Sequence, residues 1–163
     1  MSFLKKAASS LILCLFLTWN LMSVSAQTTP DCSYAASYIE EVYPEGSYWE
    51  VTIEEHAVPS VRAAQSKSGT KTGKYTDKNG KVLWSVTVSG TFTYNGTSAS
   101  CTKSSVSILD ASINWTVSDQ SAWRSGATAY ASAIGHEKNS LGQEMRTLYR
   151  QVSLTCSPEG KLS

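Results

Sequence analysis

The sequence predicts an all-β protein, an antiparallel β-sandwich with a short N-terminal helix. From Val82 to Tyr94, large apolar residues alternate strictly with small polar ones, and the dipeptides Asn79-Gly80 and Asn95-Gly96 flank this segment. Side chains of a strand point to opposite faces in turn, and Asn-Gly tolerates the positive φ of a tight hairpin turn. Further short alternating segments follow as far as Cys156. Many strands with turn signals between them are typical of antiparallel sandwiches and barrels.

Residues 1–26 have the three-part layout of a secretory signal peptide. Lys5 and Lys6 precede an apolar stretch from Leu11 to Met22, and the small residues Val24 and Ala26 precede the expected cleavage point. The apolar stretch is shorter than the ~20 residues that span a bilayer comfortably. The sequence therefore predicts a secreted or envelope-associated protein whose mature chain has no transmembrane segment.

Residues 27–68 are expected to form an N-terminal helix, a strand and a linker. Within the segment from Asp31 to Val42, aromatic and apolar residues recur every fourth position, which predicts the short amphipathic helix. Alternation from Tyr48 to Val58 predicts a strand with one wet face. The segment from Val61 to Gly73 is either a mobile connection or a polar edge strand.

Residues 69–163 are expected to form the antiparallel β-domain. The even positions of the segment from Val82 to Tyr94 form its buried face, and Gly90 interrupts that row, which indicates a bulge or a close backbone approach. A two-residue turn at Asn95-Gly96 would pair Phe92 with Ala99 and Gly90 with Cys101. Cys101 is then expected on the buried face.

The remaining strands are predicted from the same alternation. Val106 and Ile108 belong to the next strand, residues 113–118 form another, and residues 119–126 are expected to be a loop. The alternate alanines of residues 127–133 form a row of small side chains across which a tryptophan ring can lie flat. The last strand runs over residues 143–156.

The cysteines predict one crosslink. Cys14 leaves with the signal peptide, whereas Cys101 and Cys156 both fall on expected buried positions of strands. An exported protein meets oxidising conditions, so a Cys101–Cys156 disulfide is expected, with a chain-entropy contribution of roughly 4 kcal/mol. Cys32 would then stay single, either reduced or paired between chains.

Composition and motifs argue against several classes of function. The formal net charge of +1 argues against a nucleic-acid partner. The cysteines and histidines lack the short spacing of a metal site, and neither a G-x-S-x-G elbow nor a phosphate-binding glycine loop occurs. No catalytic residue, metal or cofactor is therefore predicted.

Residues 31–55 are acidic and residues 62–103 are basic, which fits either a polar partner surface or solvated strand edges.

The segment from about Thr70 to Ser163 resembles a group of small exported proteins of Gram-positive bacteria, notably clostridia, that have no assigned activity. The residues that carry the resemblance are Asn79-Gly80, Leu83-Trp84-Ser85-Val86, Gly90 to Gly96, Cys101-Thr102, Trp115, Leu154-Thr155-Cys156 and Glu159 to Ser163. The resemblance implies export and fold, and no activity.

A looser resemblance is to immunoglobulin-like sandwiches. Cys101, Trp115 and Cys156 occur in the Cys–Trp–Cys order of those domains, in which a disulfide joins the two sheets. Leu154 stands where the tyrosine corner would require Tyr. The resemblance is one of architecture, and fold does not fix function.

These observations favour a non-enzymatic exported domain that binds an envelope glycan or a protein. The aromatic residues Tyr43, Tyr48, Trp49 and Trp123 are the candidate ligand contacts if they are exposed, the alternative being that they pack in the core. A second hypothesis is an exported hydrolase with an unfamiliar site that uses Glu54, Glu55 and His56. A third is a secreted bacteriocin-like or immunity-type factor.

Overall fold

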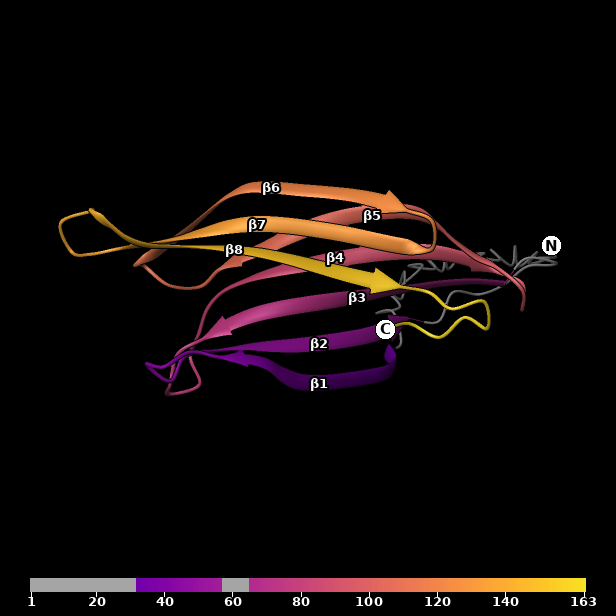
Figure 1. The fold of residues 1–163 in the computed structure, drawn as a ribbon, viewed down its shortest axis with the longest axis horizontal. Coiled ribbons are helices and arrows are strands. Elements are labelled where there is room, and N and C mark those ends of the chain that lie inside the picture. The colour runs from indigo at the N-terminus through magenta and orange to yellow at the C-terminus, as the bar shows by residue number, and fades with distance from the viewer. Residues whose placement is uncertain (1–31, 57–64) are drawn as a thin grey trace, which may run out of the picture.

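The computed structural model describes residues 32–56 and 65–163 as eight antiparallel strands in two sheets (Figure 1). The expected signal peptide and residues 57–64 of the expected strand and linker lie outside the described residues. The five-stranded sheet has the order β1-β2-β3-β4-β5 and the three-stranded sheet the order β6-β7-β8. The bounds are β1 (Cys32–Val42), β2 (Tyr48–His56), β3 (Gln65–Thr76), β4 (Val82–Tyr94), β5 (Ala99–Asp110), β6 (Trp115–Ser125), β7 (Thr128–Lys138) and β8 (Glu144–Thr155).

The two sheets pack face to face and enclose the core. β8 lies over β3 and β4, and β7 lies over β4 and β5, so that the three-stranded sheet covers one part of the five-stranded sheet (Figure 1). The prediction of an all-β, antiparallel two-sheet protein is confirmed. Within each sheet every strand pairs with its neighbours in the chain, whereas immunoglobulin domains use Greek-key connections. The strand order therefore gives the immunoglobulin-like analogy no support.

The expected N-terminal helix is wrong. Residues Cys32–Val42 form the edge strand β1, which pairs with β2 so that Ala36 faces Ile53 and Tyr38 faces Val51. A spacing of four residues is also a multiple of two, so residues four apart share a face on a strand as well as on a helix. The described residues contain no helix.

The structure corrects the register between β4 and β5 by two residues next to the turn and by three beyond a bulge, where Gly90 pairs with Ser104 instead of Cys101. Tyr94 pairs with Ala99 and Phe92 with Cys101, and a bulge follows between Cys101 and Lys103. The turn is longer than expected because Asn95 Oδ1 accepts hydrogen bonds from the amides of residues 97 and 98, at 3.0 and 2.9 Å. Next to the turn the shift is an even number of residues, so Cys101 keeps the predicted buried face.

Two more segments differ from expectation. β3 is the central strand of its sheet, so it is neither a mobile connection nor an edge strand. Residues 119–125, expected as a loop, belong to β6, which pairs with β7 on both sides of an irregularity between Ser118 and Ser121. Asp119 in this irregularity has φ 50°, a conformation that few residues other than glycine adopt.

Aromatic rings fill the space between the sheets. Trp84 of β4 is fully buried, lies edge-on to Trp49 at a centroid distance of 5.0 Å and stacks with Trp115 at 6.2 Å. The expected row of small residues faces these rings, with Ala129, Ala131 and Ala133 of β7 fully buried. Gly135 continues the row, and an added Cβ there would come within 2.4 Å of the Trp84 indole.

The Trp84–Gly135 contact predicts the effect of one added methyl group. Gly135→Ala should destabilise the protein by about 1–3 kcal/mol, because Trp84 is enclosed by other rings and cannot move aside. Urea unfolding measures the change. Ser105→Ala, on an exposed position of β5, is the control and should change stability by no more than about 0.5 kcal/mol. Equal effects of the two substitutions would contradict the tight packing of the sheets.

Candidate functional site

The structure separates the four aromatic residues that were predicted as ligand contacts. Trp49 is buried in the core, 1 % exposed, and its Nε1 donates a hydrogen bond of 3.3 Å to Tyr43 Oη. Tyr43 is partly buried against the same core, and Tyr48 is half-buried beside Val42 of β1. These three therefore form no exposed ligand surface, and of the four only Trp123 is exposed.

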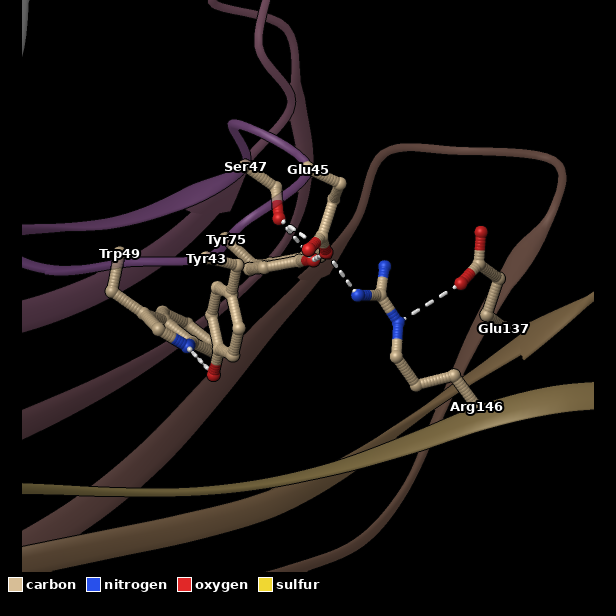
Figure 2. Close-up of polar contacts among 7 residues, drawn as sticks. All are labelled: Tyr43, Glu45, Ser47, Trp49, Tyr75, Glu137 and Arg146. Atoms are coloured by element: carbon tan, nitrogen blue, oxygen red, sulfur yellow. Dashed lines mark hydrogen bonds and ion pairs between the residues drawn. The ribbon is translucent and has the colours of Figure 1, made fainter.

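Tyr43 and Trp49 instead belong to a polar cluster that joins the two sheets at one end (Figure 2). The Arg146 guanidinium of β8 lies between two carboxylates, bonding to Glu45 and, at 3.1 Å, to Glu137. Tyr75 Oη lies 2.6 Å from the hydroxyl of Ser47, which in turn donates to Glu45 at 2.9 Å. We call Glu45, Glu137 and Arg146 the arginine clasp. Its contacts hold the two sheets together at this end, which indicates a structural role.

The electrostatics of the clasp agree with a structural role. A backbone hydrogen bond within Glu45, followed by hydrogen bonds from Arg146 and Ser47, lowers the pKa of Glu45 to about 2. The guanidinium carbon also lies 5.4 Å from the ring centre of Tyr75, a cation–π distance. Burial raises the pKa of Tyr75. The clasp thus holds a charged arginine against the aromatic core.

Trp123 lies on the outer face of the three-stranded sheet, the face that points away from the core. It is 38 % exposed and stacks on Tyr130 of β7, with ring centres 5.2 Å apart and planes 4° apart. Tyr149 of β8 is 60 % exposed on the same face, where it pairs with Ile134. We call Trp123, Tyr130 and Tyr149 the outer aromatic face.

The other end of this outer face carries three polar side chains in line, one from each strand. Ser118 Oγ of β6 lies 2.9 Å from His136 Nε2 of β7, and His136 Nδ1 lies 3.0 Å from Glu144 Oε2 of β8. Sequence reasoning missed this line because it treated the histidines as isolated. A signal was present: Asn139 and Gly142 are turn residues, and the turn that they form folds Glu144 back beside His136, where outward-facing positions of adjacent strands meet.

The residues of the hydrolase hypothesis, Glu54, Glu55 and His56, do not converge on one site. Glu54 pairs with Thr70 and His56 with Ser68 on one face of the five-stranded sheet, whereas Glu55 points to the other. There Glu55 binds Lys67 at 2.9 Å and accepts a hydrogen bond from the Leu162 amide at 3.1 Å. Glu55 therefore anchors the C-terminal segment.

Cys101 and Cys156 are both buried free thiols in the structure, so the expected disulfide is not formed in it. Their backbone amides donate to adjacent carbonyls, Cys101 to Gly126 at 2.8 Å and Cys156 to Ala127 at 3.0 Å. The two residues thus flank the same β6–β7 turn, Cys101 from β5 and Cys156 from the segment directly after β8. Burial raises the pKa of both thiols. The side chain of Cys32 is not among those that the structure describes.

The described residues contain neither a cluster of metal ligands nor a membrane-spanning helix. Among residues 32–56 and 65–163, no group of three or more His, Cys, Asp or Glu side chains is arranged to hold a metal ion. Within the same ranges, no helix has the length and apolar character needed to cross a membrane.

Comparison with known proteins found no matching family model, no matching curated protein and no matching solved structure.

The arginine clasp predicts a pH dependence of stability. Because folding lowers the pKa of Glu45 from 4.5 to about 2, the clasp contributes fully above the ordinary value, and its contribution is lost as the pH falls through about 2. Glu45→Gln should therefore lower the unfolding midpoint at about pH 6, and the difference from wild type should shrink toward about pH 2. Chemical unfolding at several pH values measures it.

Glu159→Gln is the control, because Glu159 is exposed and distant in sequence from the clasp. It should leave the pH dependence unchanged. A Glu45→Gln difference that is the same at both ends of the pH range would contradict the proposed ionised contact.

Proposed function

We propose that this chain is an exported β-domain that binds an extended glycan of the cell envelope through its outer aromatic face. The observation that carries the proposal is the stacked Trp123–Tyr130 pair, on the same sheet face as the exposed Tyr149. Sugar rings present an apolar face that stacks on aromatic side chains and hydroxyls that bind polar neighbours. Exposed rings grouped on one face of a small domain are typical of binding surfaces.

The spacing of the rings suits a polymer better than a single sugar. Tyr149 pairs with Ile134, which lies four residues along β7 from Tyr130, so the two tyrosines are separated by about 13 Å along the strand direction. Between them lie the exposed Gln151 and its pairing partner Ser132, which is buried. Tyr149 Oη donates to Gln151 Oε1 at 3.2 Å, which orients the amide on this face. A ligand that contacts both ends must be extended along β7.

Export is the second part of the proposal, and it is supported by the signal-peptide layout of residues 1–26. A folded domain on the far side of the membrane meets envelope polymers directly. A protein partner of the outer aromatic face is the alternative, and retention on glycans separates the two.

Trp123→Ala tests the binding surface. It removes the ring that stacks on Tyr130, so glycan affinity should fall about tenfold or more while stability changes little, because Trp123 lies outside the core. Retention on a panel of envelope glycans and peptidoglycan, followed by titration of the best ligand, measures the loss. Tyr149→Ala should also weaken binding.

Ile113→Ala is the matched control. Ile113 is the most exposed large apolar residue of the described chain, at 98 %, and it lies outside the outer aromatic face. Its substitution should leave affinity unchanged. A wild-type protein that is retained on no glycan of the panel would remove the proposal.

The Cys101–Cys156 disulfide is proposed for the exported, oxidised protein. Treatment with oxidised glutathione should convert the pair to a disulfide, which alkylation and peptide mass spectrometry detect. Reduction should then lower stability by up to roughly 4 kcal/mol, since the bridge restricts the unfolded chain between these residues. Cys101→Ala should abolish the bridge. Full alkylation of both thiols in the secreted protein would contradict the prediction.

A further inference from the structure

The line of Ser118, His136 and Glu144 on the outer face has no part in the proposed glycan contacts. Ser118 Oγ lies 2.9 Å from His136 Nε2, and His136 Nδ1 lies 3.0 Å from Glu144 Oε2. These are hydrogen-bond distances, as expected between a nucleophile and its base and between that base and a carboxylate. We infer that Ser118 is a nucleophile and His136 its general base, and that this site hydrolyses acyl esters. The identity of the polymer that carries the ester rests on the proposed function, whereas the assignment of the nucleophile and its base does not.

The protons in this line are arranged for base catalysis. A carboxylate only accepts hydrogen bonds, so Glu144 holds the proton of the neutral imidazole on Nδ1 and leaves the Nε2 lone pair facing Ser118. A hydrogen bond from Thr147, followed by the contact with His136, lowers the pKa of Glu144. Glu144 therefore stays ionised at neutral pH. It acts through His136 and is a positioning residue.

The backbone beside Ser118 supplies the remaining parts of such a site. Asp119 has φ 50°, and the register irregularity leaves Asp119 and Gln120 without partners in the β6–β7 pairing. Strained backbone is found disproportionately at functional sites, and amides released from a ladder can donate to a developing oxyanion. The inferred site assigns the role of oxyanion donors to the amides of Asp119 and Gln120, the two residues that follow Ser118 in this irregularity.

Asp119 also offers Ser118 a competing acceptor. Its Oδ2 lies 2.9 Å from Ser118 Oγ, so the single hydroxyl proton goes either to Asp119 or to His136. Asp119→Asn removes the charge and keeps a residue that tolerates this φ. This substitution should raise the rate of ester hydrolysis, because it weakens the acceptor that competes with His136 for the Ser118 proton.

The site lies where a polymer on the outer aromatic face would pass. Ser118 and Tyr149 flank Ile134 on opposite sides, while Trp123 pairs with Tyr130 about 13 Å along β7. The His136 side chain is 23 % exposed and that of Glu144 53 % exposed, so the site is open to a bulky substrate and to water. We consider an ester because an alcohol leaves more readily than the amine of a peptide. An O-acyl group on a sugar fits this position.

The reaction runs in two steps with water as the only co-reactant. Ser118 Oγ forms a bond to the acyl carbon as its proton passes to His136 Nε2, and the ester C–O bond breaks as that proton goes to the departing alcohol. Water then attacks the acyl-serine, giving one proton to Nε2. Release of the carboxylic acid returns that proton to Ser118 Oγ.

The test uses the full mature protein with p-nitrophenyl acetate as the probe. Ser118→Ala and His136→Ala should each lower release of p-nitrophenolate by about 10³-fold or more. Ser121→Ala, a hydroxyl on the same strand and exposed, is the control and should keep the wild-type rate. A fluorophosphonate should label Ser118, as detected by peptide mass spectrometry. Wild-type turnover by Ser118→Ala, or the absence of both turnover and label, would overturn the inference.

Glu144→Gln separates positioning from simple structural support. It should lower kcat with little change in KM, and Glu144→Asp should restore part of the rate. A change in KM alone would contradict the assigned role.

The same experiments keep this inference distinct from the proposed function. Trp123→Ala should retain hydrolysis of the small probe, and Ser118→Ala should retain the glycan. Hydrolysis that depends on Ser118 in a protein that binds no glycan would support the catalytic site and remove the proposed function alone.

Discussion

The contact between the Trp84 indole and the backbone of Gly135 is the constraint on which the arrangement of the two sheets depends. Trp84 is fully buried, and the position of a Cβ on Gly135 would lie 2.4–2.7 Å from three of its ring atoms. An L-side chain at residue 135 would therefore push the sheets apart. The row of buried alanines on β7 extends the same close approach along the strand. Small residues on one sheet thus accommodate large rings on the other.

That packing determines which side chains reach the outer face. Because residues of β7 alternate, burying Ala129, Ala131 and Ala133 turns Tyr130, Ile134 and His136 outward. The neighbouring strands then present Trp123 and Ser118 on one side and Tyr149 on the other. The candidate contacts stand on strands that the core holds rigidly, which favours a preformed surface over one shaped by its ligand.

Local patterns in the sequence predicted the positions of most strands well and the pairing between strands poorly. Alternation identified β4, including its buried Trp84, and the Asn-Gly dipeptides marked both of its ends. The same alternation was hidden in β1, where a spacing of four residues fits a helix and a strand equally. The register of β5 depended on hydrogen bonds to the Asn95 side chain, which lengthen the turn. The residue type indicates such a turn but does not fix its length.

The candidate site was harder to predict for a related reason. Trp49 occurs in a segment of alternating residues and Trp123 in one that the sequence predicts as a loop, and only the position of the second sheet decides that Trp49 is buried and Trp123 exposed. Ser118 and His136 are separated by 18 positions and meet only because β6 and β7 form a hairpin with an irregularity between Ser118 and Ser121. Sequence reasoning had no means of measuring that irregularity.

Nuclear Overhauser contacts in solution test the central constraint most directly. Close packing predicts strong cross-peaks between the Trp84 indole protons and the Gly135 Hα protons, which should also show large upfield ring-current shifts. Gly135 Hα resonances near random-coil positions, with no cross-peak to Trp84, would contradict the face-to-face arrangement of the two sheets and the outer face derived from it.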